Sequence, residues 1–271
     1  MKQHFTSSLS RAFGRFASRK HSKKFQNFIN LTYVNMMGLD MSDFNSPESY
    51  PTLNALFTRH LNKPRTFTIN PSLMISPCDS LITEVGTIQD DRALQIKGMS
   101  YRVDDFLGVN ISLENKRRIH GGEFINFYLS PRDYHRYHVP LDMKVTKAIH
   151  IPGKLYPVNI PTLKRKVDLF IENERVVLEC LTTNGKLFYL VLVGALNVGK
   201  MEVSFEPSIQ TNTTFGGGVY EYENLHLQKG DDFGCFQMGS TIIFLGEKGM
   251  IESDVMVGTS VKFGQTIGRV F

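Results

Sequence analysis

The stretch "RVVLECLTTNGKLFYLVLVG", residues 175–194, decides the fold. Two apolar runs, rich in the β-branched and aromatic residues that strands favour, flank the pair Asn184-Gly185. Asn-Gly is the preferred pair for a two-residue type I′ turn, in which both central residues have positive φ. We therefore predict that residues 175–183 and 186–194 pair as an antiparallel β-hairpin.

Short segments of similar composition recur from about residue 73 to the end of the chain, among them "LITEVGTIQ", "FINFYL", "KAIHI" and "VMVGTSVKFGQTIGRV". Ahead of them, "ESYPTLNALFTRHL", residues 48–61, predicts a helix that begins near Pro51. Its buried stripe would consist of Leu53, Leu56, Phe57 and Leu61. Short helices are also expected at 101–108 and 112–118. We expect an α+β, β-rich fold in which mostly antiparallel sheets form one domain, preceded by N-terminal amphipathic helices.

The composition excludes several classes of protein. The 271 residues contain three cysteines, Cys78, Cys180 and Cys235, with neither metal-ligand spacing nor an even number for a disulfide framework. Buried thiols in a reducing compartment are therefore expected, and no metal site is predicted. The longest apolar run, residues 187–196, is about half as long as a membrane-spanning helix requires.

The basic charge is concentrated at the N-terminus. Residues 1–39 carry +7 and no acid; since the whole chain carries +5, residues 40–271 carry −2. Apolar residues recur there at helical spacing: Phe5, Leu9, Ala12, Phe13 and Phe16, then Phe25, Phe28 and Ile29. Three interpretations remain open: a basic amphipathic helix in an anionic membrane interface, a mitochondrial transit peptide, or a helix that packs on the body. No nucleic-acid-binding motif accompanies the charge, so a nucleic-acid partner is not expected.

Candidate chemistry gathers in "FYLSPRDYHRYHVP", residues 127–140, which contains His135 and His138. No third ligand at a matching spacing is visible, so acid–base catalysis is favoured over metal binding. Asp79 in "MISPCDSLITEVG" either forms a turn or orients a histidine. Ser240 in "CFQMGSTIIF", residues 235–244, would be the nucleophile of such an arrangement, although Gly-Ser-Thr is not the G-x-S-x-G elbow of α/β-hydrolases.

Taken together, these segments resemble one family. "SPCDS", "YLSPRDYHRYHVP", "LVGALNVGKM" and "KGDDFGCFQMGST" resemble the phosphatidylserine decarboxylases in order and spacing, over roughly residues 50–270. Met238 stands where the family usually has leucine. Cys78 and Ser80 flank Asp79 where the family usually has alanine and glycine.

The resemblance implies a proenzyme that cuts itself between Gly239 and Ser240, into a β chain of residues 1–239 and an α chain of residues 240–271. Ser240 Oγ would attack the preceding carbonyl, which Gly239 leaves open because it has no Cβ. His138 would be the base, oriented by Asp79. Elimination of the ester would yield dehydroalanine at position 240, and its hydrolysis, with loss of ammonia, would leave a pyruvoyl group, derived from Ser240, as the covalent cofactor.

That cofactor would form a Schiff base with the amine of phosphatidylserine and act as the electron sink when CO2 leaves, giving phosphatidylethanolamine. His135 is the expected proton donor to the α-carbon. The roles of His135 and His138 can be exchanged, because spacing alone does not decide which faces Ser240. Two other functions remain open: a Ser-His-Asp hydrolase that is never cut, and the same chemistry on another serine-headgroup lipid.

The resemblance also favours the membrane interpretation of the N-terminus. Residues 1–45 are expected to be a basic helical membrane-contact arm, and residues 46–271 the catalytic domain. The expected location is peripheral, on the cytoplasmic face of a bacterial inner membrane, with phosphatidylserine in an anionic surface as partner. A homodimer is left open. Arg132, Arg136 and Lys154 are candidate phosphate partners, with structural pairing the alternative for the two arginines.

Overall fold

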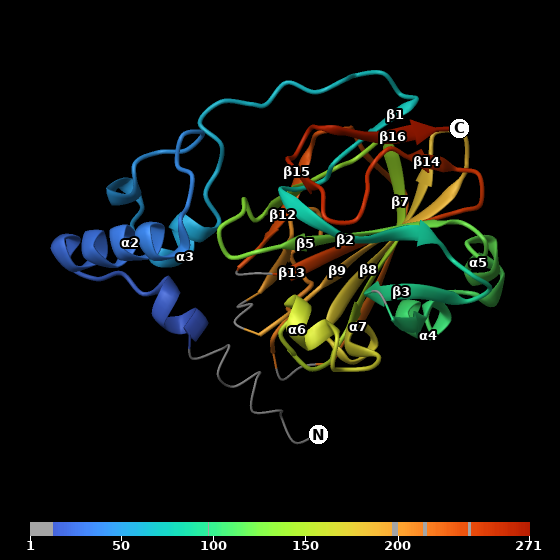
Figure 1. Ribbon diagram of the computed structural model, residues 1–271, viewed down its shortest axis with the longest axis horizontal. Helices are drawn as coiled ribbons and strands as arrows, with labels where there is room; N and C mark the ends of the chain where they lie inside the picture. Colours follow the sequence, from blue (N-terminus) through green and yellow to red (C-terminus); the bar gives the residue numbers. More distant parts are fainter. Residues whose placement is uncertain (1–12, 97, 197–199, 214–215, 238–239) are drawn as a thin grey trace.

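An eight-stranded antiparallel sheet forms the centre of the molecule (Figure 1). The computed structural model describes residues 13–96, 98–196, 200–213, 216–237 and 240–271. In spatial order the strands are β11 (Gly218–Leu227), β7 (Met143–Ile151), β8 (Arg175–Thr182), β9 (Leu187–Val193), β13 (Ser240–Gly246), β5 (Glu123–Leu129), β2 (Ser80–Thr87) and β15 (Ser260–Val261). Strand β13, close to the C-terminus in sequence, therefore lies in the middle of this sheet, between β9 and β5.

Three smaller sheets and several short helices surround this centre. The sheets are β10 (Met201–Val203), β12 (Asp232–Phe236) and β6 (Arg136–His138); β1 (Leu73–Ile75), β16 (Thr266–Val270) and β14 (Ile251–Ser253); and β3 (Arg92–Ile96) with β4 (Met99–Arg102). The helices are α2 (Lys23–Met37), η1 (Pro47–Ser49), α3 (Leu53–Phe57), α4 (Val103–Leu107), α5 (Leu113–Arg118), α6 (Ile160–Leu163) and α7 (Leu169–Glu172), and residues 13–18 are also helical. The predicted α+β, β-rich fold with N-terminal helices is confirmed.

The hairpin predicted from residues 175–194 is present as β8 and β9, but its turn differs from the prediction. Only Gly185 has positive φ, at 80°, whereas a type I′ turn would also require positive φ at Asn184. Gly185 N–H donates to Thr182 O at 3.0 Å, and Thr182 N–H donates to Lys186 O at 2.9 Å. The loop therefore has three residues, a turn followed by a left-handed glycine, which is the bulged alternative to the two-residue hairpin.

The helix predicted over residues 48–61 is shorter than expected. It begins at Leu53, because the Thr52 side chain accepts a hydrogen bond from Ala55 N–H and caps the helix there. It ends at Phe57, and Leu61 is only partly buried, beyond the helix. The helices predicted at 101–108 and 112–118 are present as α4 and α5.

Strands β9 and β13 are buried along their whole length. A strand covered on both faces is apolar throughout rather than alternating, which is the pattern of "LFYLVLV" and "STIIFLG". One hydrophobic cluster includes side chains from both strands and from the smaller sheets. A polar side chain on β13 therefore lies in the core of the protein.

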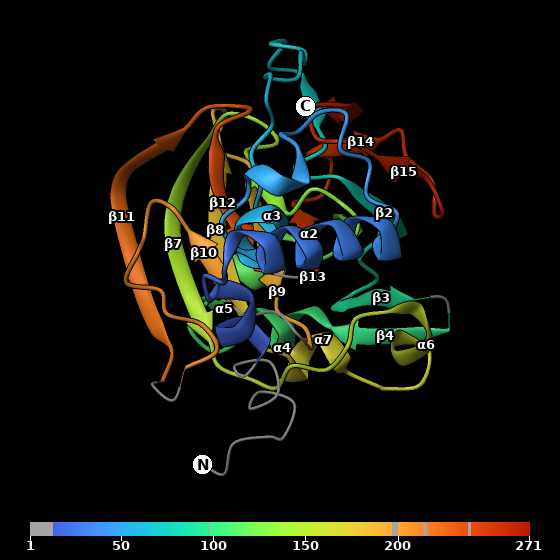
Figure 2. The ribbon, with the colours of Figure 1, turned by 90° about the vertical axis from the view of Figure 1, so that its left-hand side faces the viewer.

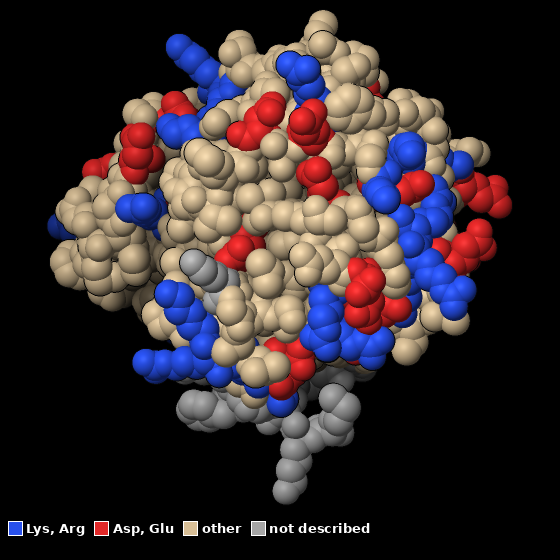
Figure 3. All heavy atoms as spheres, turned by 45° about the vertical axis from the view of Figure 1, so that its right-hand side comes forward, with Lys and Arg blue, Asp and Glu red and all other residues tan. Residues whose placement is uncertain are grey.

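The N-terminal helices lie on one side of the sheets and face the viewer in Figure 2. Tyr33 on α2 donates a hydrogen bond to Pro131 O at 3.1 Å, in the segment between β5 and β6. Tyr33 also belongs to a second apolar cluster, together with Ala17, Leu39, Leu53, Leu56 and Phe57. On the face shown in Figure 3, acidic and basic side chains are interspersed. None of the helices in the described ranges is both long and apolar enough to cross a membrane.

Candidate active site

Ser240 is the first residue of β13 and is fully buried. It pairs with Leu129, the last residue of β5, and the next residue, Thr241, pairs with both Tyr128 and Val193. The predicted scissile bond joins Ser240 to Gly239, which lies outside the described residues. Of the two residues that form the predicted scissile bond, the structure therefore describes Ser240, which lies inside the central sheet.

The buried polar atoms without a hydrogen-bond partner among the described residues include Ser240 Oγ and Thr241 Oγ1 at this strand end, and His135 Nε2. His135 is linked to the same region through the backbone, since Phe236 N–H donates to His135 O at 2.9 Å. A buried polar group without a partner costs about 1–3 kcal/mol, so proteins rarely keep one without a function. Two such hydroxyls at the start of β13 make this strand end a candidate reaction site.

His135 is enclosed by the N-terminal segment. The ring of Phe57, on α3, lies 4.0 Å from the His135 ring, centroid to centroid. His135 Nδ1–H donates to Asp133 O at 2.8 Å; since a carbonyl only accepts, the lone pair of the neutral ring is on Nε2. Burial lowers the pKa of His135 to about 3, and the Arg59 guanidinium adds to this effect. His135 is therefore neutral at pH 7, with its lone pair on Nε2.

His138, on β6, has partners at both ring nitrogens. Its Nδ1–H donates to Gly230 O at 2.9 Å, and its Nε2 accepts the Tyr134 hydroxyl at 3.0 Å. The imidazole also stacks on the ring of Phe263, with the centroids 3.6 Å apart. Burial lowers the pKa of His138, so this ring is also neutral at pH 7.

Asp79 lies between β1 and β2, beside β6. His138 N–H donates to Pro77 O at 2.8 Å, so the two sequence motifs are brought together by their backbones. The Asp79 carboxylate accepts two hydrogen bonds from Arg65, at 2.5 and 3.0 Å, and one from Phe263 N–H at 2.8 Å. No hydrogen bond joins the side chains of Asp79 and His138. Phe263 links them instead, through its N–H to the carboxylate and its ring to the imidazole.

Cys78 and Ser80, which differ from the family's usual residues, do not prevent this arrangement. Both are buried, and Ser80 is not among the residues with positive φ, so its backbone does not require glycine. Ser76 Oγ donates to Cys78 O at 2.7 Å and closes the segment locally. Asp79 is therefore presented to its partners without the usual glycine.

Four residues around the two histidines were not predicted from the sequence: Phe57, Arg65, Tyr134 and Phe263. Tyr134 lies inside the quoted motif, directly before His135, and could have been found there as a hydroxyl next to a histidine. Arg65 and Phe263 are 14 and 184 residues away from Asp79. No spacing in the sequence indicates those two contacts.

Comparison with known proteins gives the family. The family model for phosphatidylserine decarboxylase matches residues 53–269. Phosphatidylserine decarboxylase proenzymes from Helicobacter pylori and Campylobacter jejuni are each 42% identical to this chain, over 266 and 268 residues. The alignments cover 97% of this chain, and 97% and 98% of those proteins. The chain belongs to the phosphatidylserine decarboxylase family. A more distant relative of the same name, from Coxiella burnetii, is 34% identical over 97% of this chain and 94% of its own length.

Membership of the phosphatidylserine decarboxylase family gives the reaction class. The chain is a pyruvoyl-dependent decarboxylase, a lyase of phospholipid metabolism that is made as a proenzyme. The two other functions that the sequence left open, an uncut hydrolase and a decarboxylase of a different serine lipid, are not favoured by these matches. Among the described residues, no group of three metal-ligating side chains could hold a metal ion.

The three candidate phosphate partners of this decarboxylase differ in their surroundings. Arg136 forms a two-pronged ion pair with Asp232, through its Nε and Nη2. Lys154 Nζ donates to Glu172 at 2.8 Å. Arg132 is exposed, and its side chain makes no hydrogen bond or ion pair to any residue in the described part of the chain. Of the three, Arg132 is the cation left for a ligand.

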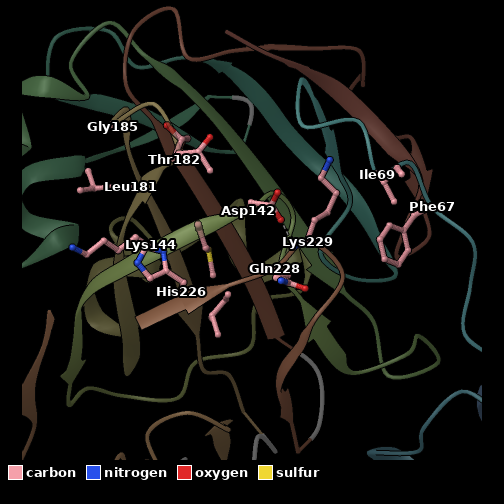
Figure 4. Close-up of a pocket in the computed structure, with 13 residues that line it drawn as sticks. Phe67, Ile69, Asp142, Lys144, Leu181, Thr182, Gly185, His226, Gln228 and Lys229 are labelled. Carbon is pink, nitrogen blue, oxygen red and sulfur yellow. Dashed lines mark hydrogen bonds between the residues drawn. The ribbon is translucent and has the colours of Figure 1, made fainter. Parts of the chain in front are cut away.

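A pocket of about 670 Å³ lies away from this site (Figure 4). Its lining comes from β7, β11, the β8–β9 turn and the segment around Phe67, and it includes none of Asp79, His135, His138 and Ser240. This pocket is thus not where the predicted site residues lie. The pocket that borders the site, formed partly by Asp79 and Ser130, is smaller, at about 570 Å³.

Proposed function

We propose that this chain cuts itself between Gly239 and Ser240 and converts Ser240 into the pyruvoyl group with which it decarboxylates phosphatidylserine. The observation that carries this proposal is the burial of Ser240 Oγ, at the first residue of a core strand, without a hydrogen-bond partner in the described structure. A serine at this position lowers the stability of the fold relative to alanine, which would fill the same space without burying an unpartnered hydroxyl. A nucleophile that is consumed in making the cofactor accounts for it.

The surroundings of Ser240 suit a carbonyl-bearing group. When present, the pyruvoyl group supplies a ketone that takes up the substrate amine and withdraws electrons as CO2 leaves. Thr241 Oγ1 and His135 Nε2 are buried and unpartnered in the described structure, so both could serve polar atoms at position 240. The residues present therefore fit the group.

The α chain would remain attached after the cut. Its strands contribute to two sheets: in the central sheet β13 lies between β5 and β9 and β15 pairs with β2, and in a smaller sheet β16 pairs with β1. These pairings interleave residues 240–271 with the β chain. Breaking one peptide bond at the start of β13 then leaves the pairings and the buried apolar surface in place.

His135 is assigned to decarboxylation. The lone pair on Nε2 puts the ring in the tautomer that can take a proton from the ammonium group of the substrate, which must be neutral to react. The same Nε2 can then return this proton to the α-carbon after CO2 has left. The contact with Phe57 and the bond to Asp133 O keep the ring in one orientation meanwhile.

His138 is assigned to self-cleavage, with Asp79 as its positioning acid. Its Nδ1–H is fixed by Gly230 O, so Nε2 is the atom that can accept the Ser240 proton once the Tyr134 hydroxyl releases it. Asp79 would act through Phe263, whose N–H it binds and whose ring supports the imidazole. An exchange of the two histidine roles remains the alternative and is tested below.

The arm is assigned to an anionic membrane surface. On α2 the buried side chains are Gln26, Asn30 and Tyr33, whereas Phe25 and Phe28 are 48% and 63% exposed. This reverses the usual polarity of a helix that packs on a protein core. Lys23 and Lys24 in the first turn of α2 suit an anionic lipid surface. We place the enzyme at the cytoplasmic face of a bacterial inner membrane; the homodimer stays a prediction.

Denaturing mass spectrometry of the purified protein tests the central step. We expect two fragments, the smaller one beginning at residue 240 with a blocked N-terminus, and release of CO2 from diacyl phosphatidylserine in preference to other serine lipids. Ser240→Ala is expected to leave one intact chain. An intact wild-type chain that still releases CO2 would contradict the proposal.

A further inference from the structure

A pocket of about 570 Å³ lies between the C-terminal end of α2 and strands β2 and β15, which are side by side in Figure 2. Met37 contributes the α2 side of the pocket, and Leu81 and Val261 contribute the strand side. The remaining lining residues are Asp79, Ser80, Tyr128, Ser130, Pro131, Arg132, Asp133, Ser260 and Lys262. The pocket therefore joins the proposed membrane-facing arm to the catalytic body.

This pocket lies near the end of the central sheet that carries Ser240, although Ser240 itself is buried and is not part of the lining. Tyr128, in its lining, pairs with Thr241, and Ser130 follows Leu129, the β-sheet partner of Ser240. Asp79, proposed above to act in self-cleavage, is also in the lining. A substrate whose amine reaches residue 240 can therefore extend the rest of its headgroup into this space.

Two exposed cations in the lining make no ion pair in the described part of the chain. Neither Arg132 nor Lys262 makes a side-chain hydrogen bond or an ion pair within the described ranges. The two carboxylates of the pocket are occupied: Asp79 binds Arg65, and Asp133 accepts Ser130 N–H and Oγ at 2.7 and 2.8 Å. The charge left unpaired in the pocket is therefore positive.

The other lining residues suit the remainder of a phospholipid. Met37, Leu81, Tyr128 and Val261 offer apolar surface to the glycerol and the first carbons of the acyl chains. Met37 ends α2, whose exposed apolar side is assigned above to the membrane. A phospholipid that leaves the membrane surface would then contact apolar residues and cations within this one pocket.

We propose that Arg132 and Lys262 bind the phosphodiester of the serine phospholipid and so fix its headgroup beside residue 240. This inference rests on the proposed function. The phosphodiester is the better partner for these cations, because its charge is the same before and after the reaction. A cation on the substrate carboxylate would stabilise the group that must lose its charge as CO2, and so would raise the barrier.

The test measures decarboxylation of dihexanoyl phosphatidylserine below its critical micelle concentration, so that no membrane surface contributes. Arg132→Gln and Lys262→Gln are compared with Arg102→Gln and Lys248→Gln, which remove equal charges outside the pocket. Arg102 is paired with Asp91, and Lys248 follows the far end of β13. We expect each pocket variant to raise KM about tenfold, with kcat within about threefold of wild type, as for loss of one charge-assisted bond. Both controls should keep the wild-type KM.

Self-cleavage distinguishes the possible failures. A wild-type protein that is not cut, or that releases no CO2, refutes the proposed function itself. A fully cut, active enzyme whose KM is unchanged in both pocket variants overturns the phosphodiester site alone, as does a loss confined to kcat. If a pocket variant is not cut, its KM cannot be measured, and inhibition of the wild-type enzyme tests the phosphodiester site instead. Glycerophosphoethanolamine should compete with the substrate at a concentration at which ethanolamine does not. Equal inhibition by the two compounds overturns the inference.

Discussion

Arg65 binds the carboxylate of Asp79 through both ends of its guanidinium group, at 2.5 and 3.0 Å, and the same Nη2 reaches Asp43 at 3.1 Å. The two acids come from different parts of the chain: Asp43 belongs to the segment after α2, and Asp79 precedes β2. Arg65 therefore ties the N-terminal segment to the acid of the proposed self-cleavage site. A planar guanidinium suits this two-pronged contact, which lysine cannot reproduce.

The first prediction concerns Arg65. Arg65→Met leaves the Asp79 side chain, which is 13% exposed, without its cation. Breaking one partner of a largely buried ion pair costs about 3 kcal/mol of stability. We expect self-cleavage to slow roughly tenfold, because Asp79 then holds Phe263, and through it His138, less firmly. The fraction of cut chain over time after cell-free synthesis measures this.

Arg118→Met is the matched control for Arg65, since it breaks the Arg118–Glu247 ion pair of 2.8 Å on another part of the surface. The control should be cut at the wild-type rate, and Arg65→Lys should lie between Arg65→Met and wild type. Unchanged cleavage in Arg65→Met would show that Asp79 works without its arginine. Unchanged cleavage in Asp79→Asn would remove Asp79 from the mechanism.

The second prediction separates the two histidines. His138→Ala should remain a single chain, because the proposed base for Ser240 is gone. His135→Ala should be cut but lose CO2 release by about a thousandfold, since a positioned acid–base group contributes about 10²–10⁴. Mass spectrometry reports the cut, and release of labelled CO2 reports the reaction. The opposite pattern would mean that the roles are exchanged.

The third prediction concerns pH and stability. The pKa of His135 is about 3 in the folded chain and near 6.5 in the unfolded chain. As the pH falls, the unfolded chain therefore binds a proton at His135 at a higher pH than the folded chain does. Stability from the neutral His135 is therefore complete above about pH 6.5 and is lost as the pH falls from there towards 3. At pH 5 the loss is about 2 kcal/mol relative to pH 7.5. Urea unfolding of Ser240→Ala, which stays a single chain, measures it.

His135→Gln in the same Ser240→Ala background is the control for this pH effect. It should lose about 2 kcal/mol less stability between pH 7.5 and 5, because glutamine does not titrate. Other buried groups titrate equally in both proteins, so the difference isolates His135. An identical loss in the two proteins would show that His135 is already exposed to protons in the folded state.

The fourth prediction concerns the arm. Phe25→Ser with Phe28→Ser should reduce sedimentation with phosphatidylserine-containing vesicles about tenfold or more, because two exposed aromatic rings leave the bilayer interface. The control pair, Val109→Ser with Val167→Ser, removes residues that are 94% and 62% exposed on the body. Binding that falls equally in both pairs would place the membrane contact outside α2.

Local sequence patterns could predict much of the fold. The strands β8 and β9 follow from composition, and helices α4 and α5 were found where expected. The hairpin turn was wrong in type, because Asn-Gly suits both a two-residue loop and a three-residue loop with glycine in the left-handed position. The helix after Pro51 was predicted too long: Thr52 caps it locally at its start, and at its end Phe57 packs against Tyr33 of α2 and the ring of His135.

The sequence by itself determined the family, the reaction class and the residues to examine, because the motifs around Asp79, His135, His138 and Ser240 keep their order and spacing along the chain. Only the tertiary structure decided which groups surround them. It placed Arg65 on Asp79, Phe263 between Asp79 and His138, and Phe57 on His135. It also placed Arg132 and Lys262 in the lining of one pocket, without an ion pair to any described residue. Contacts between residues far apart in the chain depend on how strands and helices pack, and no local pattern encodes that packing.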